Sequence, residues 1–147
     1  MSGIRQAVSD DAETLERLYR ELVPRSTHIH VLPERLAEIR RDPNNFVFVY
    51  DAGESLLGSV AVTLCLDAMY ALRPYSVVEN LIVTAGARGK GIGGKLLGYV
   101  EDVAVARGCT KIMLLSTASR EAAHAFFTRR GYNGEISRGF KKYLPLG

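Results

Sequence analysis

Apolar residues recur along this chain with two spacings that predict alternating strands and helices. Residues 77–83 (VVENLIV) form an apolar run of strand length, interrupted only by Glu79 and Asn80. After a glycine-rich turn, apolar residues return at helical spacing from Leu96 to Ala104, and Gly108 follows where a left-handed residue would end the helix. This strand, turn and helix form the predicted centre of the fold.

The same patterns predict the elements on either side of this centre. In chain order, they predict a strand at 4–8, a helix from Ser9 to near Pro24, a short helix from Pro33 to before Pro43, a hairpin of strands 46–50 and 55–66, the central unit, a strand at 110–115, a helix at 119–130 and terminal strands near 133–136 and 138–144. The order βααβββαβαββ predicts an α/β (α+β) fold, a mixed sheet with helices on both faces. We expect residues 1–147 to be one domain.

Composition and charge exclude several classes of protein. The chain is 47% hydrophobic and 24% charged, with a net charge of +3 that suits an acidic ligand. Basic residues are not arranged in stripes with aromatic residues, so we expect no nucleic-acid partner. We also expect no membrane association, because no apolar run approaches the roughly 18 residues of a span. We expect no signal peptide, because Met1–Arg5 leads straight into a predicted strand, and we expect the two cysteines to be reduced, so that the sequence predicts a cytoplasmic protein.

The turn between the central strand and helix has the chemistry of an anion site. Glycines at a helix start let backbone N–H groups approach an anion closely, and the helix dipole favours negative charge there. Arg88, Lys90 and Lys95 add positive charge around this turn. The turn is therefore expected to bind phosphate.

Two common phosphate motifs fit the turn only in part. A dinucleotide fingerprint matches at Gly89, Gly91 and Gly94, but the strand ends several residues too early and the next strand ends without an acidic residue. A P-loop fits residues 89–95, but Leu96 stands where a Ser or Thr hydroxyl should hold Mg²⁺. A P-loop nucleotide-binding protein therefore stays a lesser alternative.

A third motif fits the turn completely. Residues 88–93, RGKGIG, resemble the R-x-x-G-x-G acyl-CoA-binding motif of the GNAT superfamily of N-acetyltransferases. Residues 121–132, EAAHAFFTRRGY, are similar to the family's second helix with its closing aromatic-aromatic-x-x-x-Gly-aromatic run. The resemblance implies a strongly twisted sheet splayed between its fourth and fifth strands, with the pantetheine arm of acetyl-CoA in the gap.

The resemblance also implies a reaction and its partners. We expect an N-acetyltransferase that moves an acetyl group from acetyl-CoA, by direct attack, to a primary amine of a small molecule or peptide, without a metal. A homodimer is left open. The resemblance gives cofactor-binding roles to Leu81, Ile82, Val83, Arg88, Gly89, Lys90, Gly91, Ile92, Gly93, Gly94, Lys95 and Phe127.

Glu79 is the candidate general base. Only about one alkylammonium in 10³ is neutral at pH 7, so a carboxylate near the acceptor would help to generate the nucleophile. Glu79 lies in an otherwise apolar strand, where desolvation is expected to make it a better base. The alternative is that Glu79 forms an ion pair with a neighbouring Arg or Lys.

The usual acid of the family is missing. A tyrosine often protonates the departing thiolate, and the matching position here is Phe127, which has no proton to donate. Tyr132, Tyr75 or water is a substitute donor, although a core position is the alternative for Tyr132, and a thiolate of pKa about 8.5 to 10 can also leave unaided. Phe127 equally suggests a rival function, a catalytically silent acyl-CoA-binding module.

Overall fold

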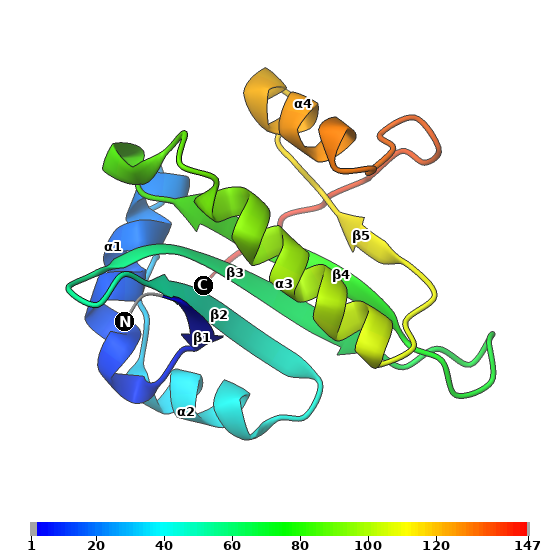
Figure 1. The fold of residues 1–147 in the computed structure, drawn as a ribbon, viewed down its shortest axis with the longest axis horizontal. Helices are drawn as coiled ribbons and strands as arrows, with labels where there is room; N and C mark the ends of the chain where they lie inside the picture. Colours follow the sequence, from blue (N-terminus) through cyan, green and yellow to red (C-terminus); the bar gives the residue numbers. More distant parts are fainter. Residues whose placement is uncertain (1–2, 147) are drawn as a thin grey trace. The chain divides into compact units, whose positions relative to one another are not determined.

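The computed structural model describes residues 3–146, which form two compact units divided after Leu114. The first unit contains a five-stranded sheet in the order β1-β2-β3-β4-β5, with three α-helices (Figure 1). The elements are β1 (Gly3–Gln6), the 3₁₀ helix η1 (Ser9–Asp11), α1 (Ala12–Leu22), α2 (Pro33–Arg41), β2 (Asn45–Asp51), β3 (Leu56–Cys65), β4 (Tyr75–Val83), the 3₁₀ helix η2 (Ala85–Ala87), α3 (Ile92–Ala106), β5 (Ile112–Leu114) and, in the second unit, α4 (Glu121–Arg129). The mixed fold class predicted from the sequence is confirmed.

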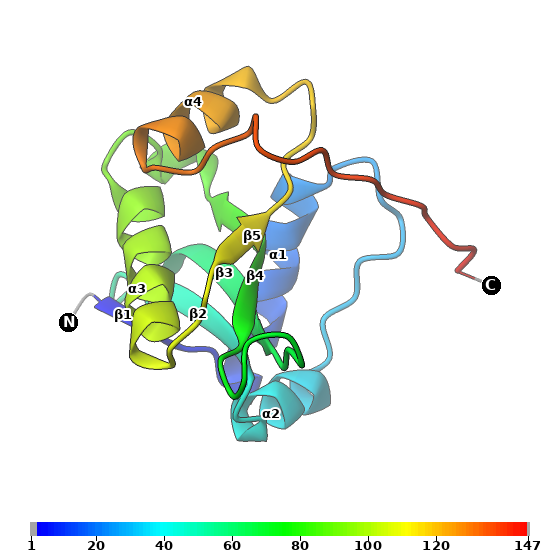
Figure 2. The ribbon, with the colours of Figure 1, turned by 90° about the vertical axis from the view of Figure 1, so that its right-hand side faces the viewer.

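Helices cover both faces of the sheet in the first unit, with α1 and α2 on one side and α3 on the other (Figure 2). The alternation of strand side chains explains the two layers. Val47 and Val49 of β2 join the core beneath α1, whereas Phe48 between them packs its ring against Tyr99 of α3 with 4.8 Å between centroids. Leu96, on α3, is fully buried. Each face of the sheet is therefore covered by packed apolar side chains.

A β-bulge in β4 interrupts the sheet where the predicted site begins. Asn80 has a left-handed φ of 56°, and the β3–β4 register shifts between Ala61, opposite Glu79, and Ser59, opposite Ile82. On its other side, β4 pairs in parallel with β5 only over residues 76–78. Beyond the bulge, the backbone of β4 has no strand partner on that side among residues 3–146. This is the separation of the fourth and fifth strands that the resemblance implies.

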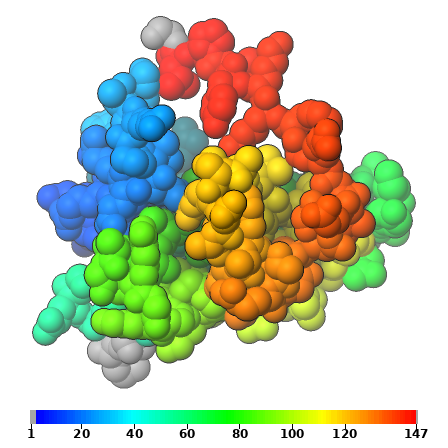
Figure 3. All heavy atoms as spheres, turned by 90° about the horizontal axis from the view of Figure 1, so that it is seen from above, coloured from blue at the N-terminus to red at the C-terminus, as the bar shows by residue number. Residues whose placement is uncertain are grey.

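The prediction of two terminal strands, near 133–136 and 138–144, is wrong for the part of the chain that the structure describes. No residue between α4 and residue 146 lies in a strand there. The strands were predicted from apolar residues such as Phe140 and Tyr143, but both side chains remain exposed. Alternating apolar residues favour a strand, yet a strand also needs a second backbone segment to accept and donate its hydrogen bonds. Figure 3 shows the atoms of this segment at the red end of the colour scale.

The structure also bears on the other expectations about organisation. The single domain expected from the length stays a prediction, because two units are described separately. Within residues 3–146, every helix is too short or too polar to cross a bilayer. Cys65 and Cys109 are not joined in a disulfide.

Candidate functional site

The turn between β4 and α3 has an anchored half, residues 84–88. The backbone N–H of Thr84 donates to the carbonyl of Leu57 on β3 at 2.9 Å, and the Thr84 carbonyl accepts from the N–H of Ala87 at 2.9 Å. The Arg88 side chain folds back, and its Nε donates to the carbonyl of Val83 at 3.0 Å. The anchored half is therefore fixed to the end of β4.

The other part of the turn is the free half, residues 89–94, whose backbone N–H groups have no acceptor among residues 3–146. Gly89 and Gly91 both have φ of 80°, a conformation that suits glycine, and Gly91 is the N-cap of α3. Following the chain beyond Arg88, the first backbone N–H that has an acceptor belongs to Lys95. It donates to the carbonyl of Gly91 at 3.1 Å. The predicted cofactor positions in this half are Gly89, Lys90, Gly91, Ile92, Gly93 and Gly94.

The free half is suited to an anion for two physical reasons. The first N–H groups of an α-helix have no partner inside the helix, and α3 directs the positive end of its dipole toward them. No acidic residue lies in the first turn of α3. A Cβ atom built on Gly89 or Gly91 would meet no atom within 4 Å, so the space in front of these residues is open. A diphosphate fits this donor set.

The three predicted cations of the turn differ in their surroundings. Arg88 is exposed and bonded to Val83, and Lys90 is exposed. Lys95 places its ammonium 5.8 Å from the centre of the Tyr50 ring on β2, a cation–π contact. All three side chains are exposed and add positive charge to that of the helix terminus.

The predicted pantetheine residues lie on the part of β4 beyond the bulge. Ile82 buries its side chain in the core beneath α1, with 4% of its surface exposed, and pairs with Ser59 of β3. Leu81 and Val83 are half-buried neighbours. Because β5 pairs only with residues 76–78, the second backbone edge of this segment has no strand partner among the described residues, although the Val83 carbonyl already accepts from Arg88 Nε.

Glu79 is exposed, so the desolvation expected at this carboxylate is absent. The cause is the bulge at Asn80, together with the end of the β4–β5 ladder at Val78. The alternative ion pair with a neighbouring Arg or Lys is also not seen among the residues that the structure describes. Glu79 therefore lies in the same strand as the predicted pantetheine residues, with its carboxylate open to solvent.

The second unit brings Phe127 and Tyr132 together. Their ring centroids are 6.1 Å apart in an edge-to-face contact, and the backbone N–H of Tyr132 donates to the carbonyl of Phe127 at 3.0 Å. Gly131, with φ of 91°, makes the reversal after α4 that permits this contact. The position of the missing tyrosine and its substitute candidate are thus direct neighbours.

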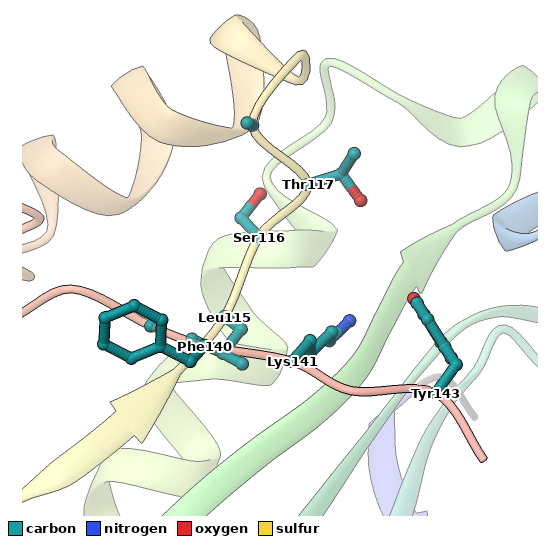
Figure 4. Close-up of a pocket in the computed structure, with 8 residues that line it drawn as sticks. Leu115, Ser116, Thr117, Phe140, Lys141 and Tyr143 are labelled. Atoms are coloured by element: carbon teal, nitrogen blue, oxygen red, sulfur yellow. The ribbon is translucent and has the colours of Figure 1, made fainter.

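A cavity that the sequence did not predict lies in the second unit. It has a volume of 240 Å³, between residues 115–118 and residues 139–143 (Figure 4). Its polar lining includes Ser116, Thr117, Lys141 and Tyr143, and the buried Ser116 Oγ has no hydrogen-bond partner among the described residues. No motif marked these residues, because two segments far apart in the chain form the cavity together.

The histidines and acidic residues form no cluster that indicates a metal. His30 lies 3.3 Å from a Glu16 carboxylate oxygen, and the Nε2 of His124 is 2.9 Å from the carbonyl of Thr117. Within residues 3–146, no group of three or more His, Cys, Asp or Glu residues is placed to hold an ion.

Known proteins resemble this chain in sequence and in fold. Residues 12–132 match the model of the Acetyltransferase (GNAT) family. The chain is 24% identical over 129 residues to an aminoalkylphosphonate N-acetyltransferase of Salmonella typhimurium, covering 88% of this chain and 83% of that protein.

Solved structures share the fold at lower identity. Glucosamine-6-phosphate N-acetyltransferase from Arabidopsis thaliana superposes with a TM-score of 0.84 at 20% identity, with 99% of each chain covered. AAC(6')-Iy, solved in complex with the bisubstrate analogue CoA-S-monomethyl-acetylneamine, gives a TM-score of 0.78 at 17% identity, with 99% of each chain covered.

Proposed function

Because this chain belongs to the GNAT family of acetyltransferases, we propose that it moves an acetyl group from acetyl-CoA to a primary amine of a small molecule or peptide. The observation that carries the proposal is the free half of the turn, residues 89–94, whose N–H groups have no acceptor among the described residues at the start of α3. A diphosphate is the part of acetyl-CoA that such a site recognises.

The donor binds to the first unit at two places in this proposal. The N–H groups of residues 89–94 hold the diphosphate, and Arg88 and Lys90 add charge. The pantetheine arm lies along the unpaired edge of β4 and forms amide hydrogen bonds with residues 81–83, as an added strand would. A backbone N–H of the same segment is then available to the thioester oxygen, where it stabilises the oxyanion without reorganisation.

The transfer proceeds by direct attack. Glu79, itself or through one water, removes a proton from the ammonium, and the neutral nitrogen forms a bond to the acetyl carbon. The nitrogen of the tetrahedral intermediate gives up its second proton to water, and the intermediate collapses by breaking the carbon–sulfur bond, which releases the CoA thiolate and an acetylated amine. Because Phe127 carries no acid, the thiolate leaves unprotonated or takes a proton from water or from Tyr132.

Small amines that carry an anionic group are the first acceptors to test. The name of the Salmonella relative gives aminoalkylphosphonates as its substrates. The net charge of this chain, +3, favours acidic ligands in general. An aminoalkylphosphonate, a neutral amino sugar and a peptide amine therefore form a suitable panel.

A thiol-release screen with acetyl-CoA and this panel tests the proposal, together with thermal-shift titrations of acetyl-CoA and of ATP with Mg²⁺. Amine-dependent release of free thiol, with stabilisation by acetyl-CoA but not by ATP, is the expected result. Stabilisation by acetyl-CoA without release of free thiol in the presence of any amine would favour the silent binding module that Phe127 suggests. Stabilisation by ATP alone would favour a P-loop protein. The cytoplasmic location and the oligomeric state stay predictions.

A further inference from the structure

A carboxylate from α1 holds the anchored half of the turn. Glu21 Oε2 accepts a hydrogen bond from Thr84 Oγ1 at 2.8 Å, and Glu21 Oε1 accepts one from the backbone N–H of Ala85 at 3.1 Å. One carboxylate therefore binds two consecutive residues at the point where β4 becomes the turn.

The needs of α1 itself do not explain the position of Glu21. It lies in the last turn of α1, where the helix dipole disfavours negative charge. Other glutamates of this helix bind arginines one turn away, as Glu13 binds Arg17 and Glu16 binds Arg20. Glu21 instead reaches a segment more than sixty residues away in the chain. Its contacts are explained by the turn that it holds.

We propose that Glu21 is a positioning residue for the diphosphate of the donor, an inference that rests on the proposed function. Glu21 acts through Thr84 and Ala85 and does not touch the free half. Thr84 is fixed through its N–H, its carbonyl and its hydroxyl, and only the hydroxyl contact depends on α1. Without Glu21, the turn samples more conformations, so binding the diphosphate costs more ordering of residues 89–94.

Glu21→Ala tests this role, with Glu13→Ala as the matched control on the exposed face of the same helix. Calorimetric titration with CoA should show a Kd about five- to tenfold higher for Glu21→Ala, a loss in the range of one ordinary net hydrogen bond. The Kd of Glu13→Ala should stay within about twofold of the wild type, the change expected for a surface substitution.

A second donor separates positioning from general structural damage. S-acetylpantetheine carries the thioester but no diphosphate, so its kcat/KM should be unchanged by Glu21→Ala, while kcat/KM for acetyl-CoA falls in proportion to the CoA affinity. Thr84→Val removes one of the two contacts and preserves the side-chain shape. It should lower kcat/KM for acetyl-CoA by a smaller factor than Glu21→Ala does, and it should also leave kcat/KM for S-acetylpantetheine unchanged. The double variant should lose less CoA-binding free energy than the sum of the two single losses, because both substitutions remove the same Glu21–Thr84 hydrogen bond.

Unchanged CoA affinity in both Glu21→Ala and Thr84→Val would overturn the inference, and so would an equal loss with the two donors. If the wild-type protein itself bound no CoA, the proposed function would fail, and this inference with it.

Discussion

Gly91 is the residue at which the anion-binding geometry depends most directly on backbone conformation. It is the N-cap of α3, with φ of 80° and ψ of 8°, and a Cβ there would meet no atom within 4 Å. Gly91→Ala therefore creates no clash, and its cost comes from the left-handed backbone alone. That cost is roughly 1–2 kcal/mol for a residue with a Cβ.

Gly86 provides a matched control three residues before the free half. It is exposed, lies in η2, also has open space at its Cβ position and lacks the positive φ. Both substitutions reduce the freedom of the unfolded chain by a similar amount, about 0.4–1 kcal/mol. The difference between the two variants thus isolates the left-handed cost. With an unfolding entropy of about 0.3 kcal/mol/K for a chain of this length, Gly91→Ala should melt about 3–6 °C below Gly86→Ala.

Calorimetric melting of the two variants, followed by titration with CoA, measures both consequences. We expect Gly91→Ala to weaken CoA binding about tenfold, because relief of the strained φ moves the N–H groups that hold the diphosphate, a loss of about 1.4 kcal/mol. Gly86→Ala should bind like the wild type. The CoA affinity of Gly91→Asn should lie between those of Gly91→Ala and Gly86→Ala, since Asn tolerates a positive φ better than Ala. Equal melting temperatures for Gly91→Ala and Gly86→Ala would refute the reasoning.

Three further outcomes are expected. Glu79→Gln should lower kcat at least tenfold, within the range for a general base, with CoA affinity unchanged; an identical pH–rate profile in wild type and variant would exclude Glu79 as the base. Phe127→Tyr should melt within about 2 °C of the wild type and raise kcat where thiolate departure limits the rate; a large loss of CoA binding would contradict this. Burial alone would raise the pKa of Asp11, but hydrogen bonds from Arg5 (2.8 and 3.0 Å) and from the N–H of Val8 hold it below its ordinary value. Asp11 therefore stabilises the folded state at pH values above its unfolded pKa of about 3.9. This contribution is lost as the pH falls through the lower pKa of the folded state. Asp11→Asn should therefore reduce the pH dependence of the unfolding free energy in that window.

Local sequence determined the central unit and its glycines. Gly108 was predicted to end the long helix, and it has φ of 72° directly after the C-cap of α3. The hairpin turn after Asp51 was likewise predicted, and there the N–H of Gly53 donates to the Asp51 carboxylate at 2.8 Å. Such features depend on the conformational range of one residue and its nearest neighbours, which a single sequence contains.

Pairing between distant segments decided what the sequence left open or predicted wrongly. The bulge at Asn80 arises from the register of β3 against β4, and with the short β4–β5 ladder it leaves Glu79 exposed where desolvation was expected. The apolar residues after α4 predicted strands, yet a strand also requires a partner, and the described segment has none. Glu21 carried no signal at all, because its partner Thr84 is 63 residues away. The sequence thus determined which elements form and where backbone N–H groups gather, whereas the tertiary structure decided which side chains are buried, exposed or tethered, since each of those states depends on residues that only folding brings together.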